Sequence, residues 1–154
     1  LHNEYAARHV LFFTEYKATQ SLLMSALIAK FGPESVTFIN GDERAEEVVD
    51  SYGRPRTILE NRGIAAEKFN SAKVRFLVST EAAGEGIDLQ ESCHHLMHVD
   101  LPWNPMRLHQ RVGRVNRYGQ TKRVQVVTIR NPATVESLLL SLRPAFQAKK
   151  KVSI

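Results

Sequence analysis

The sequence predicts an α/β fold in which a parallel β-sheet lies between two layers of helices, as a three-layer α/β/α sandwich. Short apolar runs alternate along the chain with segments of helical periodicity. The runs are rich in Val, Ile and Phe and lack polar alternation, which is typical of strands buried on both faces. A helix between consecutive strands is the connection that parallel strands need. The 154 residues are enough for one domain, or for one lobe of a larger enzyme.

The predicted elements follow from these patterns in chain order. Five apolar segments are predicted as strands: 9–14, 36–39, 74–80, 96–100 and 124–129. Four segments with helical spacing are predicted as helices: 17–31, 57–70, 104–117 and 133–143. The stretch 41–62 contains an acidic, helix-like run, "DERAEEVVD", before Gly53 and Pro55 interrupt it.

The charge of the chain is unevenly distributed. Residues 1–102 hold 10 Lys+Arg and 15 Asp+Glu, whereas residues 103–154 hold 11 Lys+Arg and one acid, Glu136. This polarity predicts a basic surface that faces a polyanion, either nucleic acid or nucleotide phosphates. For the terminal run Lys149–Lys151, a solvated tail is the preferred interpretation.

The sequence also gives weaker indications of the cellular compartment and of whether the chain is part of a longer protein. No apolar run is long enough to cross a bilayer, and there is no signal-peptide pattern. The single cysteine, Cys93, excludes an internal disulfide and suits the cytoplasm. Because the first residue is Leu1 rather than Met, we expect the chain to be part of a longer protein.

The segment "QRVGRVNRYGQ" (110–120) crowds three arginines together. On a helix, Arg111, Arg114 and Arg117 would fall within one arc, and no acid lies within a helical turn of them. Arginine cannot lose its proton, and its planar fork matches phosphate oxygens in pairs. The cluster therefore predicts an anion supplied from outside; a solvated basic face is the alternative.

A second segment, "STEAAGEGIDLQ" (79–90), directly follows a predicted strand. Gly84 and Gly86 permit a tight turn and a close approach of the backbone to a ligand. Asp88 is suited to accept hydrogen bonds from sugar hydroxyls, and Ser79 and Thr80 offer hydroxyls suited to phosphate contact. The position of this segment 24 residues before the arginine cluster strengthens its interpretation as a nucleotide or nucleic-acid site.

Together with "DLPWNPMRLHQRVGRVNRYGQ" (100–120), these segments resemble the motor core of Swi/Snf-type ATPases of helicase superfamily two, and in particular the bacterial RapA (HepA) branch. "VLFFTEY" resembles motif IV, "STEAAGEGIDLQ" motif V and "QRVGRVNRYGQ" motif VI. The resemblance covers nearly the whole chain. It implies a RecA-like, P-loop NTPase-type second lobe over residues 1–148, followed by a basic tail at 149–154.

The resemblance implies roles for individual residues. It implies catalytic roles for Gln110, Arg114 and Arg117, nucleotide binding by Gly84, Gly86, Asp88 and Arg111, and nucleic-acid contacts by Thr14, Ser79 and Thr80. Arg114 and Arg117 match the two arginine fingers that stabilise charge on the transferring γ-phosphate. Trp103 is expected to be buried and to organise its loop rather than to stack on a base.

The sequence lacks a G-x-x-x-x-G-K-[ST] segment and an acidic pair after a strand that would hold Mg²⁺. We therefore expect ATP with Mg²⁺ to be held by an N-terminal RecA-like lobe of the same protein, and the isolated chain to hydrolyse no ATP. The expected partners are nucleic acid, with double-stranded DNA favoured, and a target such as RNA polymerase or another nucleoprotein. The expected location is the cytoplasm of a bacterium or archaeon, with no membrane contact.

Three alternatives remain at this point. One is a true strand-separating helicase on RNA or DNA, and another is a nucleic-acid-binding module without ATPase activity. A partner-docking domain is disfavoured because it leaves the ordered motifs unexplained.

The segment "CHHLMH" (93–98) contains residue types that bind metals. His95 and His98 would point to opposite faces of a strand, however, and the adjacent His94 would diverge from His95. No metal site is therefore predicted there. The length of 41–62 exceeds the family's usual connection and indicates an inserted element.

Overall fold

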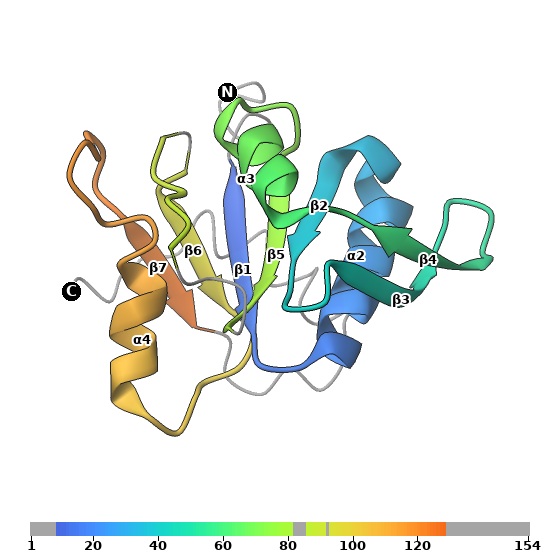
Figure 1. The fold of residues 1–154 in the computed structure, drawn as a ribbon, viewed down its shortest axis with the longest axis horizontal. Helices are drawn as coiled ribbons and strands as arrows, with labels where there is room; N and C mark the ends of the chain where they lie inside the picture. Colours follow the sequence, from blue (N-terminus) through green and yellow to red (C-terminus); the bar gives the residue numbers. More distant parts are fainter. Residues whose placement is uncertain (1–8, 82–85, 92, 129–154) are drawn as a thin grey trace.

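The computed structural model describes residues 9–81, 86–91 and 93–128. A five-stranded sheet with the order β2-β5-β1-β6-β7 forms its centre, and every strand pair in it is parallel (Figure 1). The strands are β1 (Val10–Thr14), β2 (Val36–Ile39), β5 (Phe76–Thr80), β6 (His95–His98) and β7 (Gln125–Thr128). The five predicted strands are thus confirmed, and their carboxyl ends meet at one edge of the sheet.

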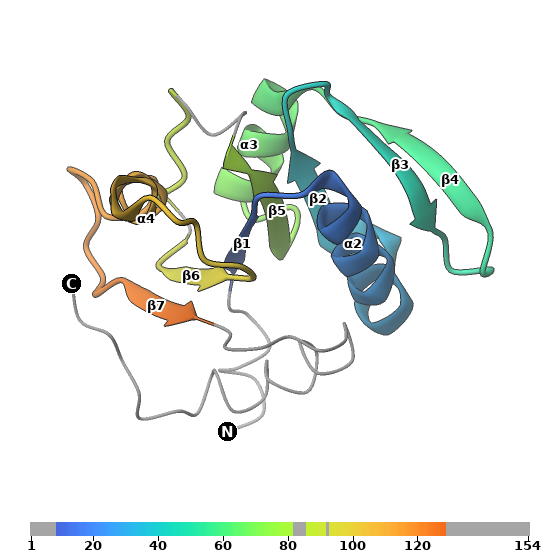
Figure 2. The ribbon, with the colours of Figure 1, turned by 90° about the horizontal axis from the view of Figure 1, so that it is seen from below.

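Helices cover both faces of the sheet, which confirms the predicted three-layer α/β/α fold (Figure 2). The helices are α2 (Lys17–Phe31), α3 (Arg62–Asn70) and α4 (Pro105–Val112), with a short 3-10 turn at Pro33–Ser35. Helix α2 packs on one face, and α3 and the end of α4 pack on the other. None of the described helices is long and apolar enough to cross a membrane. The predicted helix 133–143 and the tail 149–154 lie outside the described residues.

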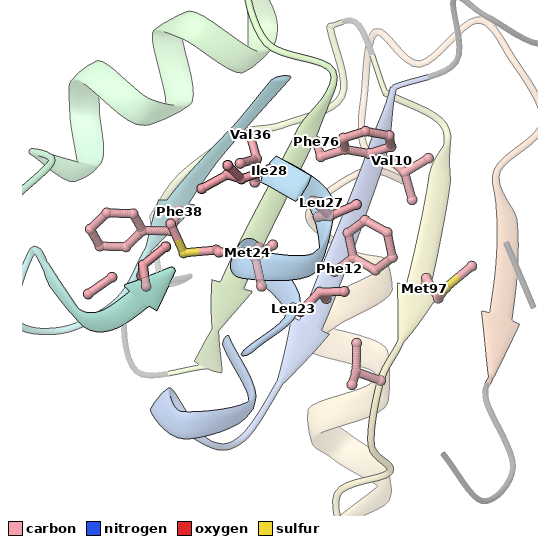
Figure 3. Close-up of a cluster of buried hydrophobic side chains, with 14 residues drawn as sticks. Val10, Phe12, Leu23, Met24, Leu27, Ile28, Val36, Phe38, Phe76 and Met97 are labelled. Carbon is pink, nitrogen blue, oxygen red and sulfur yellow. The ribbon is translucent and has the colours of Figure 1, made fainter. Parts of the chain in front are cut away.

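Alternation along β1 shows why its sequence is apolar throughout. Val10 and Phe12 face α2, where they join the buried cluster drawn in Figure 3, whereas Leu11 and Phe13 face α3 and the end of α4. Successive strand residues point to opposite faces of a sheet, so a strand covered on both faces needs an apolar residue at every position. The two apolar clusters fix the sheet between its helices.

Local sequence sets the helix boundaries. Gly32 adopts φ +92° and ends α2, and its N–H donates to the Ile28 carbonyl oxygen at 2.9 Å. The Asn61 side chain caps α3 by accepting from the Gly63 N–H. The Asn104 side chain caps α4 in the same way, and the following proline has the backbone angle that a first helical residue requires.

The stretch 41–62 forms an antiparallel hairpin of β3 (Arg44–Val49) and β4 (Pro55–Leu59), so the helix-like interpretation of "DERAEEVVD" is wrong. A register shift between Ala45 and Val48 buries these two residues, three positions apart, against the α2 cluster. A bulged strand can therefore show helical spacing. The predicted helix 57–70 accordingly begins only at Arg62. That this hairpin is an element inserted relative to the family stays a prediction.

A buried glutamine ties α2 to the edge of the sheet. Gln20 is fully buried, and its side-chain nitrogen donates to the carbonyl oxygens of Ile39 (3.1 Å) and Val78 (2.8 Å). Its side-chain oxygen accepts a hydrogen bond from Asn40 at 2.9 Å. These bonds satisfy the carbonyls near the ends of β2 and β5 and hold the turn that leads into the hairpin.

We expect Gln20→Ala to lower the free energy of unfolding by about 2–4 kcal/mol, because it removes the side-chain donor to two buried carbonyls and one of the two acceptors of the Asn40 amide. Urea unfolding followed by circular dichroism measures this loss. Lys17→Ala is the control, since its ion pair with Asp42 is exposed and is worth at most about 1 kcal/mol. Equal effects of the two substitutions would contradict the role of Gln20.

Candidate functional site

The candidate site lies at the carboxyl edge of the sheet, where β1, β5 and β6 end beside α4. Arg111, in the last turn of α4, is only 2% exposed and projects into this edge. Its guanidinium contacts the Glu81 carboxylate through Nε (2.7 Å) and Nη2 (2.6 Å). Its other contacts are the Asp100 carbonyl oxygen (2.8 Å), His98 Nδ1 (3.2 Å) and the Asp100 carboxylate (3.3 Å). Five N–H donors of the guanidinium therefore meet five protein contacts.

This placement contradicts two predictions about Arg111. The expectation that the arginine cluster has no carboxylate nearby is wrong for this residue, because Glu81 and Asp100 reach it from the ends of β5 and β6 rather than from its own helix. The predicted nucleotide contact of Arg111 is also contradicted, since its donors are engaged inside the protein. Arg111 anchors α4 to the sheet.

The strand-end hydroxyls are buried as well. The Thr14 hydroxyl donates to the Asp100 carboxylate, which also accepts from the backbone N–H of Glu15 at 3.0 Å. Ser79 is buried and donates to the Thr80 carbonyl oxygen at 3.1 Å. The predicted direct phosphate contacts of Thr14 and Ser79 are therefore corrected: both hydroxyls bond within the protein. Thr80 is buried at the end of β5, and its nucleic-acid contact stays a prediction.

Arg114 and Arg117 do not continue the helix of Arg111. Helix α4 ends at Val112, and tight turns follow, with the Arg114 N–H donating to the Arg111 carbonyl oxygen at 3.1 Å. The expectation of a helix through 104–117, with three arginines on one arc, is therefore wrong. Val112 and Val115 are both buried in the core, so the turns after α4 are held against the sheet.

An open hollow of about 480 Å³ brings three predicted catalytic residues together. It is lined by Gln110, Gly113, Arg114, Asn116, Arg117 and Tyr118. Arg111 does not line it. The structure thus separates the cluster into one buried arginine and two that border an open surface, beside the predicted glutamine.

Residues 86–90, which follow the glycine-containing turn, lie against residues 113–118, called the arginine loop below. The side chains of Arg117 and Asp88 form an exposed ion pair, and the Leu89 N–H donates to the Arg114 carbonyl oxygen at 3.1 Å. Gly86 has φ +80°, a conformation that glycine adopts without strain. Predicted nucleotide-binding and catalytic residues are therefore neighbours. Gly84 lies outside the described residues.

Gln120 is a positioning residue that sequence reasoning missed. Its side-chain nitrogen donates to the carbonyl oxygens of Cys93 (2.8 Å), Val115 (3.0 Å) and Gln90 (3.3 Å). One amide therefore joins the arginine loop to the loop after β5 and to the start of β6. The sequence carries no local signal for this contact, because the three acceptors are backbone groups.

Other residues at this edge were also missed or misplaced. Glu81, Asp100 and Arg107 were not predicted, although strand-end acids at the edge that receives the arginines were a usable signal. Arg107 is exposed and contacts Glu81 at 2.8 Å. Trp103 is 99% exposed, so the expectation that it is buried is wrong.

The histidine-rich segment is a buried part of the core. Burial raises the pKa of the Cys93 thiol to about 12, which disfavours the thiolate that binds metals. The rings of His94 and His95 lie 4.1 Å apart, so the expected divergence of these neighbours is wrong. Across residues 9–81, 86–91 and 93–128, no group of three or more His, Cys, Asp or Glu side chains is placed to hold a metal ion.

His98 gives the site a pH dependence. Burial, followed by the nearby Arg111 charge, lowers the pKa of His98 from 6.5 to about 4. Between pH 6.5 and about pH 4, His98 is therefore protonated in the unfolded chain but neutral in the folded protein. The free energy of unfolding falls as the pH is lowered through this window, because protonation favours the unfolded chain.

We expect wild-type protein to lose roughly 3 kcal/mol of unfolding free energy between pH 6.5 and pH 4 through this residue. In His98→Asn the amide oxygen takes the place of Nδ1 as an acceptor for Arg111, but the titrating group is gone, so this part of the loss disappears. Urea unfolding of both proteins across the window measures the difference. Parallel stability curves would show that His98 does not titrate as described.

Comparisons with known proteins agree with this arrangement. Residues 2–119 match the family described as the helicase conserved C-terminal domain. The chain is 38% identical over 135 residues to the uncharacterized ATP-dependent helicase YqhH of Bacillus subtilis, covering 86% of this chain and 21% of that protein. It is 40% identical over 86 residues to the RNA polymerase-associated protein RapA of Pectobacterium atrosepticum, covering 54% of this chain and 9% of that protein. The chain thus spans a small part of these relatives.

Solved structures show the same fold. The C-terminal part of the Fun30 ATPase domain superposes with a TM-score of 0.63 at 21% identity, covering 88% of this chain and 39% of that one. Domain 2 of the DEAD-box helicase Mss116p, bound to an RNA duplex, gives a TM-score of 0.62 at 19% identity, covering 99% of this chain and 52% of that one. The chain therefore belongs to the helicase C-terminal domain family, with a RecA-like fold and relatives among the ATP-dependent helicases of the Swi/Snf and RapA type.

Proposed function

We propose that this chain is the C-terminal motor lobe of an ATP-dependent nucleic-acid translocase. In this function Arg114 and Arg117 stabilise the negative charge on the γ-phosphate of ATP, which a companion N-terminal lobe holds. The observation that carries the proposal is the shared hollow, where Gln110, Arg114 and Arg117 border one open surface. Phosphoryl transfer concentrates charge on the phosphate oxygens, and arginine forks suit those oxygens.

The ion pair between Arg117 and Asp88 is compatible with this role. Both side chains are about half exposed, so the pair is screened by solvent and contributes at most about 1 kcal/mol. A triphosphate carries more negative charge than one carboxylate and can displace it from Arg117. Asp88 is then released to accept hydrogen bonds from the ribose, the role that its motif implies.

The donor set of the hollow fits a triphosphate but not its metal ion. The arginine side chains present N–H donors to an anion, whereas Mg²⁺ in nucleotide sites is usually bound through one or two carboxylates, and no carboxylate is among the described residues that line the hollow. The sequence also lacks the G-x-x-x-x-G-K-[ST] segment that cradles phosphates. We therefore assign the binding of the phosphates and of Mg²⁺ to the companion lobe. In this proposal ATP lies in a cleft between the two lobes, and the cleft closes when the lobes come together.

Duplex DNA is the proposed track, and a nucleoprotein such as RNA polymerase is the proposed target. The name of one relative, the RNA polymerase-associated protein RapA, supports such a target. Another relative, the Arabidopsis thaliana protein Chromatin Remodeling 4, is 30% identical over 156 residues, a stretch that covers this whole chain and 6% of that protein. The exposed Trp103 supports nucleic-acid binding, since a free indole is suited to stack on bases or sugars.

A strand-separating helicase is the second candidate, favoured because several relatives are named as ATP-dependent helicases. A strand-displacement assay on the full-length protein separates the two candidates. A translocase hydrolyses ATP on duplex DNA without releasing a strand, whereas a helicase releases one.

We expect Arg114→Ala and Arg117→Ala in the full-length protein each to lower kcat for ATP by about 10³-fold or more, with KM for ATP changed only a few-fold. The reason is that the fingers act mainly on the transition state. Steady-state phosphate release measures both constants. Arg56→Ala is the control, because Arg56 is an exposed arginine paired with Asp50 on the hairpin.

The 154-residue chain alone is expected to release no phosphate. Hydrolysis by this chain, or full activity in both finger variants, contradicts the proposal. Full activity of the finger variants in cells together with weakened nucleic-acid binding would instead identify a binding module.

A further inference from the structure

Arg107 is the exposed cation above the strand ends where nucleic-acid contacts were predicted. The hydroxyls of Thr14 and Ser79 at those ends bond within the protein. The residues that follow β1 and β5 are Glu15 and Glu81, and Arg107 Nη1 lies 3.5 Å and 2.8 Å from their carboxylates. Its side chain is 53% exposed. At these strand ends, the guanidinium of Arg107 is therefore exposed to a ligand, whereas the hydroxyls are not.

Two arginines one helical turn apart share the Glu81 carboxylate unequally. Arg111 takes Oε1 through two nitrogens and is buried, whereas Arg107 touches only Oε2 and uses only Nη1. Among the described residues, Nε and Nη2 of Arg107 have no acceptor. The contacts of the half-exposed Arg107 side chain are weak and are screened by salt, whereas the buried pair of Arg111 is screened much less. Arg111 is thus fixed, and Arg107 can exchange its partner.

We propose that Arg107 binds a phosphodiester group of the nucleic acid, exchanging its contacts with Glu15 and Glu81 for phosphate oxygens. The inference rests on the proposed function in one respect, that the protein binds nucleic acid. Arginine pairs with phosphate through two parallel hydrogen bonds, and Nε and Nη2 of Arg107, which have no acceptor within the described part of the chain, allow this geometry. Trp103, four residues earlier in the chain, is fully exposed and is suited to stack on a base or a sugar.

The carboxylates around Arg107 affect how readily a phosphate can bind to it. Arg111 offsets the charges of Glu81 and Asp100, because its guanidinium contacts both carboxylates. Within residues 9–81, 86–91 and 93–128, Arg107 is the one cation paired with the Glu15 carboxylate, at 3.5 Å, so this carboxylate repels an incoming phosphate most directly. Removing the charge of Glu15 should therefore help a phosphate to bind, provided that Arg107 is present.

The test is the salt dependence of nucleic-acid binding by the full-length protein. Fluorescence anisotropy with labelled duplexes of about 20 base pairs, one of DNA and one of RNA, gives Kd between about 50 and 300 mM KCl. For Arg107→Gln on the preferred duplex we expect binding about fivefold to tenfold weaker near 0.1 M salt, and a slope of log Kd against log salt smaller by about 0.9. Arg56→Gln is the matched control and should leave both values unchanged.

Glu15→Gln should tighten binding about twofold or more, and this gain should vanish when Arg107→Gln is also present. A salt slope unchanged by Arg107→Gln overturns the inference. So does a raised KM for ATP with duplex binding intact, which would assign Arg107 to the nucleotide, or a lowered Tm with equal weakening at every salt concentration. If wild-type protein binds neither duplex, the proposed function itself fails, whereas salt-dependent wild-type binding matched by Arg107→Gln rejects only this inference.

Discussion

The buried charge of Arg111 is the constraint on which the candidate site depends. An arginine that is almost fully removed from water must be paired, and breaking such a pair costs about 3–5 kcal/mol. Here the pairing groups come from the ends of β5 and β6, and Asp100 in turn binds Thr14 at the end of β1. One guanidinium therefore holds three strand ends and α4 in a fixed relation. The loop that carries Arg114 and Arg117 begins two residues after this anchor, so its starting position is fixed as well.

The uneven charge of the sequence acquires a second meaning in the fold. The basic residues after position 102 meet acids from the first part of the chain: Arg107 and Arg111 meet Glu81, and Arg117 meets Asp88. Part of the basic excess is thus used within the protein and does not face a polyanion. The arginines differ in how firmly they are held, because solvent screens the exposed pairs and not the buried one. That difference separates a structural cation from those that a phosphate can reach.

The sequence predicted the sheet and most of its helices because their signals are local. The strand that ends at Thr14 is recognised from its own run of apolar residues. The end of the following helix is recognised from Gly32, because glycine adopts the backbone angles that end a helix. The first strand of the hairpin has a helix-like sequence because its bulge buries Ala45 and Val48 at helical spacing. The site was harder to predict. Whether Arg111 meets acids, and whether Trp103 is exposed, depends on strand ends and loops that are distant in sequence and adjacent in space.

The central claim is that one arginine of the cluster anchors the fold while two others reach the transferring phosphate. The most direct measurement is a structure of the full-length protein with ADP and aluminium fluoride, which mimics phosphoryl transfer. The account predicts that the guanidiniums of Arg114 and Arg117 lie within about 3 Å of the fluoride ligands, while Arg111 keeps its contacts with Glu81 and Asp100. Fluoride contacts made by Arg111 instead, with the other two arginines turned away, would contradict it.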